Sequence, residues 1–193
     1  MAWLAKISKK VVGIDLSENS LRLAKERIEK EKIGGKVEII SMDCEKLSFP
    51  DNSFDVVFDG GTFSSLDIKK ALGEISRVLK PDGFLVGIET FGHNPLANLK
   101  RKLNEKTGKR TSWAAGHIIQ KKDLKEMNKY FEKKEVYFFH LISFIIFPFL
   151  KVPIFIFLLK LMEVGERVLL KIPFLKKYAF KIVFVSFKPK KNG

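Results

Sequence analysis

The stretch VVGIDLSENS, residues 11–20, decides the fold class of this chain. Val11–Ile14 is a short apolar run rich in β-branched residues, which is typical of a buried parallel strand. Asp15 ends the run, and Ser17 is a suitable N-cap for an amphipathic helix that ends at the glycine pair 34–35. A strand followed at once by such a helix predicts the first half of a β-α-β unit.

The same alternation of apolar runs and helical patterns continues outward from this stretch. Further strands are predicted at 36–41, 54–58, 84–88, 134–140 and 179–187, with helices at 68–79 and 123–131. This order predicts an α/β fold with a doubly wound, mostly parallel sheet and right-handed crossovers. No linker or repeat divides the sequence, so residues 1–193 are interpreted as a single domain.

Composition limits the classes of function. A hydrophobic content of 46% indicates a globular protein, and no basic-then-apolar leader opens the sequence, so a cytoplasmic location is expected. The single cysteine, Cys44, excludes an internal disulfide and a cysteine-based zinc site. The three histidines have no metal-ligand spacing, and no metal is predicted.

The net charge of +14 favours an anionic partner: nucleic acid, an acidic membrane surface or an acidic substrate. An ordinary lysine-rich solvated surface is the alternative interpretation.

Asp15 is the first candidate binding residue. A carboxylate at the carboxyl end of a strand in such a sheet can accept hydrogen bonds from the hydroxyl groups of a ribose. The same position also suits an acid that only caps a helix, and both interpretations stay open for Asp15 alone.

Three stretches together carry a resemblance to a known family: VVGIDLS at 11–17, SMDCEKLSFPDNSFD at 41–55 and EISRVLKPDG at 74–83. They resemble the middle of class I S-adenosylmethionine-dependent methyltransferases of the small-molecule type, and the resemblance covers residues 2–90 well. It implies that Asp15 binds the ribose of S-adenosylmethionine. It also implies a last strand that runs antiparallel to the others.

The resemblance assigns further cofactor-binding residues. Asp43 is implied to accept a hydrogen bond from the adenine amino group, and the backbone N–H of Cys44 to donate to a ring nitrogen. Gly60, just beyond a strand, is implied to line the methionine part of the cofactor, where glycine permits close approach. A plain turn explains Gly60 equally well.

The sequence departs from the family at its start. The family has a first strand and a GxGxG loop before this point, whereas no GxGxG occurs here and Met1–Lys6 resembles the helix that follows that loop. We therefore expect that this central strand and its loop are missing, through a wrongly assigned start codon or a truncated gene.

No catalytic residue is assigned. His93, His117 and Glu89 are candidate general bases, each also explained as an ordinary structural residue. The segment DGGT at 59–62 does not match the Asn/Asp-Pro-Pro-aromatic motif of family members that methylate nucleic-acid bases. Nucleic acid is therefore not the predicted acceptor, despite the positive charge.

An apolar and basic helical insertion is predicted at 141–177, before the last strand. Its apolar part, 141–170, contains Pro148 and Pro153 and is too interrupted for a membrane-spanning helix. Three interpretations stay open: helices lying peripherally on an anionic membrane, a lid over an apolar acceptor pocket, or plain core or homodimer packing.

The sequence thus predicts methyl transfer from S-adenosylmethionine to a small, hydrophobic or lipid-like acceptor. One alternative is a non-catalytic remnant that binds a membrane or a partner. Another is a nicotinamide-dependent oxidoreductase, which would share Asp15 but leaves Asp43, Cys44 and Glu45 unexplained.

Overall fold

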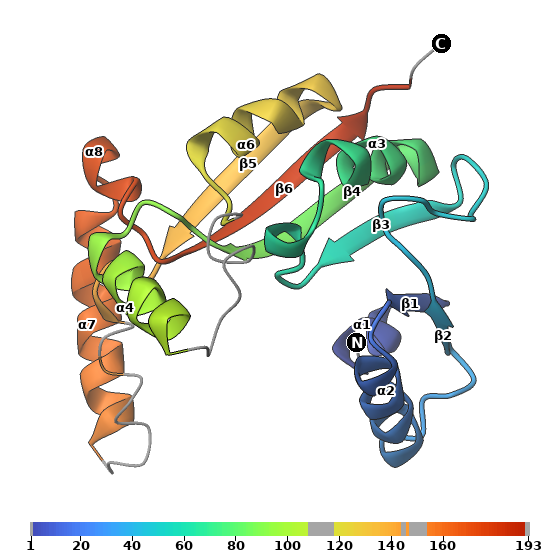
Figure 1. Cartoon of the computed structure of the whole chain (residues 1–193), viewed down its shortest axis with the longest axis horizontal. Helices are drawn as coiled ribbons and strands as arrows, with labels where there is room; N and C mark the ends of the chain where they lie inside the picture. Colours follow the sequence, from blue (N-terminus) through green and yellow to red (C-terminus); the bar gives the residue numbers. More distant parts are fainter. Residues whose placement is uncertain (1, 108–117, 144–145, 147–153, 192–193) are drawn as a thin grey trace. The chain divides into compact units, whose positions relative to one another are not determined.

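The structure is a computed structural model that describes residues 2–107, 118–143, 146 and 154–191. The chain divides into two compact units, Met1–Pro50 and Asp51–Gly193, and each unit is described by itself (Figure 1). The interpretation of the chain as a single domain stays a prediction.

The first unit is the β-α-β unit that the sequence predicts. Its elements are α1 Ala2–Ile7, β1 Val11–Asp15, α2 Glu18–Lys30 and β2 Val37–Ser41. β1 and β2 are parallel, and Asp15 lies opposite Ser41 in the ladder. Ser17 caps α2, because its hydroxyl oxygen accepts a hydrogen bond of 3.3 Å from the Ser20 N–H.

This first unit buries little. Among its described residues, the buried apolar side chains are Ala5 and Ile28, and β1 pairs on one edge only, with β2. A core of this size contributes little stability. The expectation that a central strand and its glycine loop are missing stays a prediction.

The second unit is built on a mixed sheet in the order β3-β4-β6-β5. Its strands are β3 Phe54–Asp59, β4 Leu79–Thr90, β5 Phe131–Phe139 and β6 Lys181–Pro189. β3 is parallel to β4, whereas β6 runs antiparallel to both of its neighbours. The predicted antiparallel last strand is confirmed.

Helices surround this sheet in Figure 1. They are α3 Ile68–Val78, α4 Pro95–Lys106, α6 Lys121–Glu126, α7 Phe155–Leu169 and α8 Pro173–Lys176, with 3₁₀ turns at Phe63–Ser65 and Met127–Lys129. α3 covers the core with its predicted apolar face, including Ala71, Leu72 and Ile75. Asp67 caps this helix by accepting from the backbone N–H groups of Lys69 and Lys70.

Three predicted boundaries are wrong. The helix expected to end at the glycine pair 34–35 ends at Lys30. The turn expected at 81–83 lies inside β4, because Leu79 already pairs with Phe54 and the ladder resumes after a register shift. The helix expected at 123–131 ends at Glu126 and continues as a 3₁₀ turn, so β5 begins at Phe131 rather than at 134.

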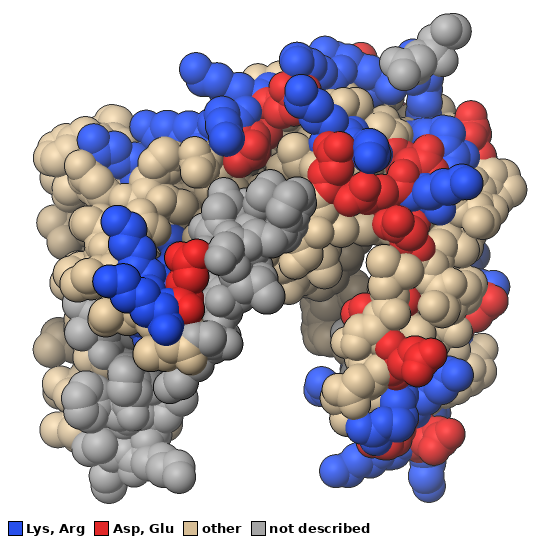
Figure 2. Space-filling view, viewed as in Figure 1, with Lys and Arg blue, Asp and Glu red and all other residues tan. Residues whose placement is uncertain are grey.

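The apolar insertion folds as α7 and α8 in its described part. Pro148 and Pro153 lie outside the described residues. Within the described part of the chain, no helix has the length and apolarity needed to cross a bilayer. Lys and Arg side chains form several groups over the face seen in Figure 2 rather than one continuous patch.

The centre of the sheet depends on a close contact between β4 and β6. Gly87 lies opposite Phe184, whose ring occupies the place where a side chain would begin. A Cβ atom at residue 87 would lie 2.1 Å from Cζ of Phe184. Phe184 is fully buried, and the centroid of its ring lies 6.1 Å from the centroid of the Phe63 ring. Only glycine therefore fits at position 87.

We predict that Gly87→Ala lowers the free energy of unfolding by roughly 3 kcal/mol or more, since the ring has no space to move in the core. Urea denaturation followed by circular dichroism measures this change. Gly165→Ala is the matched control, because a Cβ there meets nothing within 4 Å and alanine favours the helix. Equal stability of the two variants would contradict the packing argument.

Candidate functional site

The two predicted cofactor-binding acids lie at the carboxyl ends of neighbouring parallel strands. Asp15 ends β1, and Asp43 follows two residues after Ser41, the residue paired with Asp15 in β2. The Met42 N–H donates to the Asp15 carbonyl at 3.3 Å, which holds the start of the loop after β2 against the end of β1. Ligands of open α/β sheets bind at this edge.

Each of these carboxylates forms a local turn with one oxygen. Oδ1 of Asp15 accepts from the Ser17 N–H at 2.8 Å, and Oδ1 of Asp43 accepts from the Glu45 N–H at 2.9 Å. Within the described residues, Oδ2 of neither Asp15 nor Asp43 accepts a hydrogen bond. The local turns therefore orient the two carboxylates while leaving an acceptor atom on each.

Cys44 directly follows Asp43 in the loop after β2 and is half-buried. The Lys46 N–H donates to the carbonyl of Asp43 at 3.2 Å, so the backbone turns at this point. An acceptor side chain and an adjacent backbone donor at one turn match the edge of a purine ring in chemical type.

Gly60 belongs to the second unit, where it is exposed at the end of β3. The preceding Asp59 is buried and accepts from Gly61 N–H at 3.3 Å and Thr62 N–H at 3.0 Å, and from the Thr62 hydroxyl. Gly61 has φ +106°, a conformation that favours glycine. The segment 59–62 is thus an ordered turn.

A buried carboxyl pair lies beside this turn, and the sequence indicated only one of its members. Glu89 of β4 is buried, and its carboxyl oxygens accept from the backbone N–H groups of Phe63 at 2.8 Å and Thr90 at 3.3 Å. Burial and the negative charge of Asp59 raise the pKa of Glu89 to about 8. Its contacts favour a structural role over that of a general base.

His93 also has structural contacts. Its Nε2 accepts from the Lys121 N–H at 3.3 Å, and its ring meets Phe91 edge-on at 5.0 Å. Burial and the nearby positive charges of Lys121 and Lys177 lower the pKa of His93, so the ring is neutral at pH 7. His117 lies outside the described residues.

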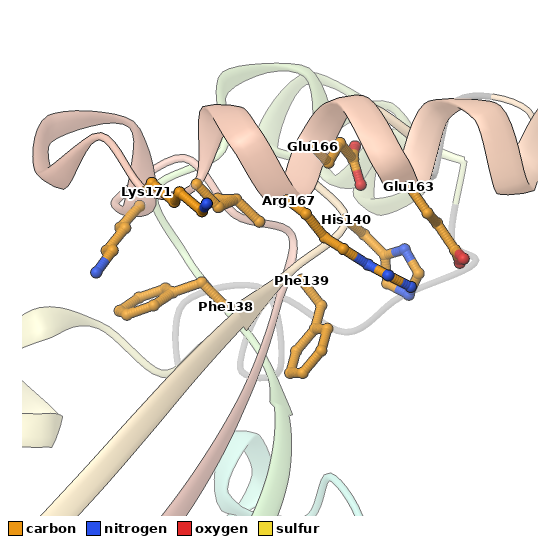
Figure 3. A pocket seen from close by; sticks show the side chains of 9 residues that line it. Phe138, Phe139, His140, Glu163, Glu166, Arg167 and Lys171 are labelled. Atoms are coloured by element: carbon orange, nitrogen blue, oxygen red, sulfur yellow. The ribbon is translucent and has the colours of Figure 1, made fainter.

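A cavity of about 480 Å³ lies between the end of β5 and the helices α7 and α8 (Figure 3). Its apolar part is formed by Phe138, Phe139 and Leu170. The polar residues that line it are His140, Glu163, Glu166, Arg167, Lys171 and Lys176. The cavity thus combines aromatic surface with a predominance of cations, which suits an apolar ligand that carries a polar or acidic group.

No pattern in the sequence indicated that His140 belongs to this cavity. His140 has φ +58°, an uncommon conformation for a residue other than glycine, and its Nδ1 lies 2.9 Å from Oγ of Ser143. Ser143 donates its hydroxyl proton to Glu166 at 2.8 Å. Because that proton is used, Nδ1 of His140 is the donor to Ser143.

Glu166 fixes this arrangement. It is buried, and its carboxylate also accepts from the backbone N–H groups of Ser143, at 2.5 Å, and Ile142. A residue of α7 therefore holds the loop that follows β5 and, through Ser143, the ring of His140.

Residues 1–87 match a family described as a methyltransferase domain, which confirms the resemblance seen in the sequence of this part. A demethylmenaquinone methyltransferase of Bacteroides fragilis is 39% identical over 84 residues, which are 42% of this chain and 34% of the relative. A protein of the same name from Listeria welshimeri is 44% identical over 85 residues, 44% of this chain and 36% of the relative. The chain spans about a third of the length of these curated relatives.

Among the solved structures that are similar over most of this chain is phosphoethanolamine N-methyltransferase 2 of Haemonchus contortus in complex with phosphomonomethylethanolamine and S-adenosylhomocysteine. The TM-score is 0.64 at 23% identity, and the match covers 94% of this chain and 44% of that one. This likeness shows the fold, and the predicted α/β class is confirmed.

We predict that Glu89 makes the protein less stable as the pH rises. The unfolded chain releases this proton near pH 4.5, whereas the folded protein keeps it to about pH 8, so the free energy of unfolding falls between these values. The slope is at most about 1.4 kcal/mol per pH unit. Urea denaturation at a series of pH values measures it.

Glu89→Gln should flatten this pH dependence, because an amide cannot lose the proton. Glu132→Gln, at an exposed residue of β5, is the control and should keep the wild-type slope. A wild-type free energy of unfolding that does not change between about pH 5 and pH 8 would contradict the raised pKa of Glu89 beside Asp59.

Proposed function

We propose that this protein transfers a methyl group from S-adenosylmethionine to a small apolar acceptor. The observation that carries the proposal is the position of Asp15 and Asp43, at the carboxyl ends of two adjacent parallel strands. Both acids lie within residues 1–87, the part that is similar to the methyltransferase domain family.

The residues present fit the adenosyl part of this cofactor in donor and acceptor type. Asp15, through Oδ2, accepts hydrogen bonds from the ribose hydroxyls. Asp43 accepts from the adenine amino group, and the backbone N–H of Cys44 donates to a ring nitrogen. When bound, S-adenosylmethionine supplies an electrophilic methyl group. The residues named here bind and orient it, since positioning is the main source of rate in such displacements.

Gly60 is proposed to allow close approach of the methionine part of the cofactor, because it is exposed and has no side chain.

The acceptor is proposed to be an apolar ring compound of the prenylated quinone type. Support comes from the two relatives named as demethylmenaquinone methyltransferases, and from the aromatic cavity at the end of β5. The reduced form of such a ring carries acidic hydroxyl groups. Nε2 of His140, whose Nδ1 donates to Ser143, would accept a proton from one of them and make the quinol ring a stronger nucleophile.

We predict that Asp15→Ala and Asp43→Ala each weaken S-adenosylhomocysteine binding by roughly tenfold to a hundredfold, since each removes a charged acceptor of one or two hydrogen bonds. Isothermal titration calorimetry measures the dissociation constants. Glu29→Ala, an exposed acid of α2, is the control that leaves binding unchanged. Wild-type affinity in both aspartate variants would refute the proposed site.

The deaminated analogue S-inosylhomocysteine distinguishes the roles of the two acids. It lacks the adenine amino group, so wild-type protein should prefer S-adenosylhomocysteine to it. Asp43→Ala should lose most of this preference, whereas Asp15→Ala should keep it. An unchanged preference in Asp43→Ala would place the adenine elsewhere.

We predict that His140→Gln lowers kcat for methylation of a reduced short-chain demethylmenaquinone by at least tenfold, because the acceptor loses its base. Transfer of radiolabel from S-adenosylmethionine measures the rate. The dissociation constant for S-adenosylhomocysteine should not change. His93→Gln is the control histidine outside the cavity, and an equal loss of rate in both variants would contradict the assignment.

A further inference from the structure

The outward face of the helix α7 is apolar. Phe155 and Glu166 are buried on the inner face, with exposed fractions of 7% and 3%. The outward row at helical spacing has exposed fractions of 58–64%: Phe157, Leu161, Val164 and Val168. With about 100° per residue, this row lies directly opposite Phe155 and Glu166. A solvated helix face is expected to be polar, and this one is not.

The helix α4 has the same arrangement. Its inner face is held by Ala97 and by the buried Arg101, which donates to Asn98 at 2.7 Å and to the carbonyl of Phe91 at 3.4 Å. The opposite face carries an apolar row with exposed fractions of 49–59%: Leu96, Leu99 and Leu103. The outward row of α7 and that of α4 are together called the α4–α7 surface.

Cations border both rows. On α4 these are Lys100, Lys102 and Lys106, and around α7 they are Lys160, Arg167 and Lys171, all exposed. The acids of these helices are less exposed than the cations: Glu105 and Glu163 are half-buried and Glu166 is buried, while Glu163, Arg167 and Lys171 also line the cavity at the end of β5. The α4–α7 surface therefore combines apolar rows with positive charge.

The two helices follow strands that end at the same edge of the sheet. β4 and β5 are both antiparallel to β6 and hence parallel to each other, so α4 and the segment leading to α7 leave one edge (Figure 1). The side chain of Asn94, the N-cap of α4, donates to the carbonyls of Leu141 at 3.1 Å and Tyr178 at 2.6 Å. The start of α4 is thereby tied to both ends of the α7–α8 segment.

We infer that the α4–α7 surface docks on a bilayer of anionic phospholipid. Outward apolar rows bordered by lysine and arginine are the features by which helices lie in a membrane interface, with the rows among the acyl chains and the cations at the phosphates. The inference goes beyond the proposed methyl transfer and is tested without it.

An anionic bilayer fits these observations better than an acidic protein partner. The same pattern occurs independently on two helices, and a fluid lipid surface accommodates both rows without a matching set of pockets. Three cations border each row with no exposed acid among them, which matches a uniformly negative surface.

Sedimentation of the full chain with vesicles tests the inference, with no cofactor present. We expect the chain to bind vesicles of equal parts phosphatidylglycerol and phosphatidylcholine at low salt, and to bind pure phosphatidylcholine at least tenfold more weakly. The double variants Leu99→Asp with Leu103→Asp, and Leu161→Asp with Val164→Asp, should each weaken binding at least tenfold. Each of Lys100→Ala, Lys102→Ala and Lys160→Ala should weaken it roughly fivefold.

Matched controls use exposed residues of the first unit. Ile7→Asp, Leu23→Asp and Lys25→Ala should bind vesicles as the wild type does, and circular dichroism checks that every variant is folded. Equal binding to both kinds of vesicle, or wild-type binding by both double variants, would overturn the inference. So would a dimer in light scattering that the double variants convert to a monomer, because the surface would then be an interface between copies of this chain.

Discussion

The sheet of the second unit depends on the contact of the Phe184 ring with the bare backbone of Gly87. This contact brings Phe184 against Phe63, and the backbone N–H of Phe63 in turn donates to the carboxyl of Glu89 at 2.8 Å. Glu89 then lies beside Asp59, which shapes the turn at the end of β3. A steric constraint at the centre of the sheet thus determines the geometry at the carboxyl ends of β3 and β4.

The two units differ in how they hold their polar residues. In the second unit Asp59, Glu89 and Glu166 are buried, and both carboxyl oxygens of each accept hydrogen bonds from backbone N–H or side-chain hydroxyl groups, so their carboxyls organise turns. In the first unit Asp15 and Asp43 sit on short turns after strands, and each keeps one oxygen for another partner. Rigid carboxylates serve the fold, whereas the accessible ones suit a ligand.

Local patterns predicted much of the fold. The strand at 11–15 and the helix after it were predictable because a β-branched run, an N-cap serine and helical spacing agree there. The turn predicted at residues 81–83 was wrong, because sheet pairing on both sides of these residues overrides their local preference for a turn.

The carboxyl pair and His140 could not be predicted. They arise from strand pairing and from a loop held by a distant helix, and neither leaves a pattern in adjacent residues.

The orientation of α4 and α7 could not be predicted from the sequence either. A pattern-based assignment turns leucines inward and charges outward. Here Arg101 and Glu166 are buried because each satisfies backbone groups of another segment, and the rows with Leu99 and Leu161 face outward. Hydrophobicity alone identifies both helices as amphipathic but cannot tell which side packs against the sheet.

The order of the strands has a consequence for synthesis. Once Phe139 has left the ribosome, both β4 and β5 are outside it. The strand that pairs with both of them, β6, begins only at Lys181. During that interval the newly made chain exposes strand edges with unpaired backbone groups and the apolar side chains of α7. The nascent chain is therefore most in need of a chaperone just before β6 completes the sheet.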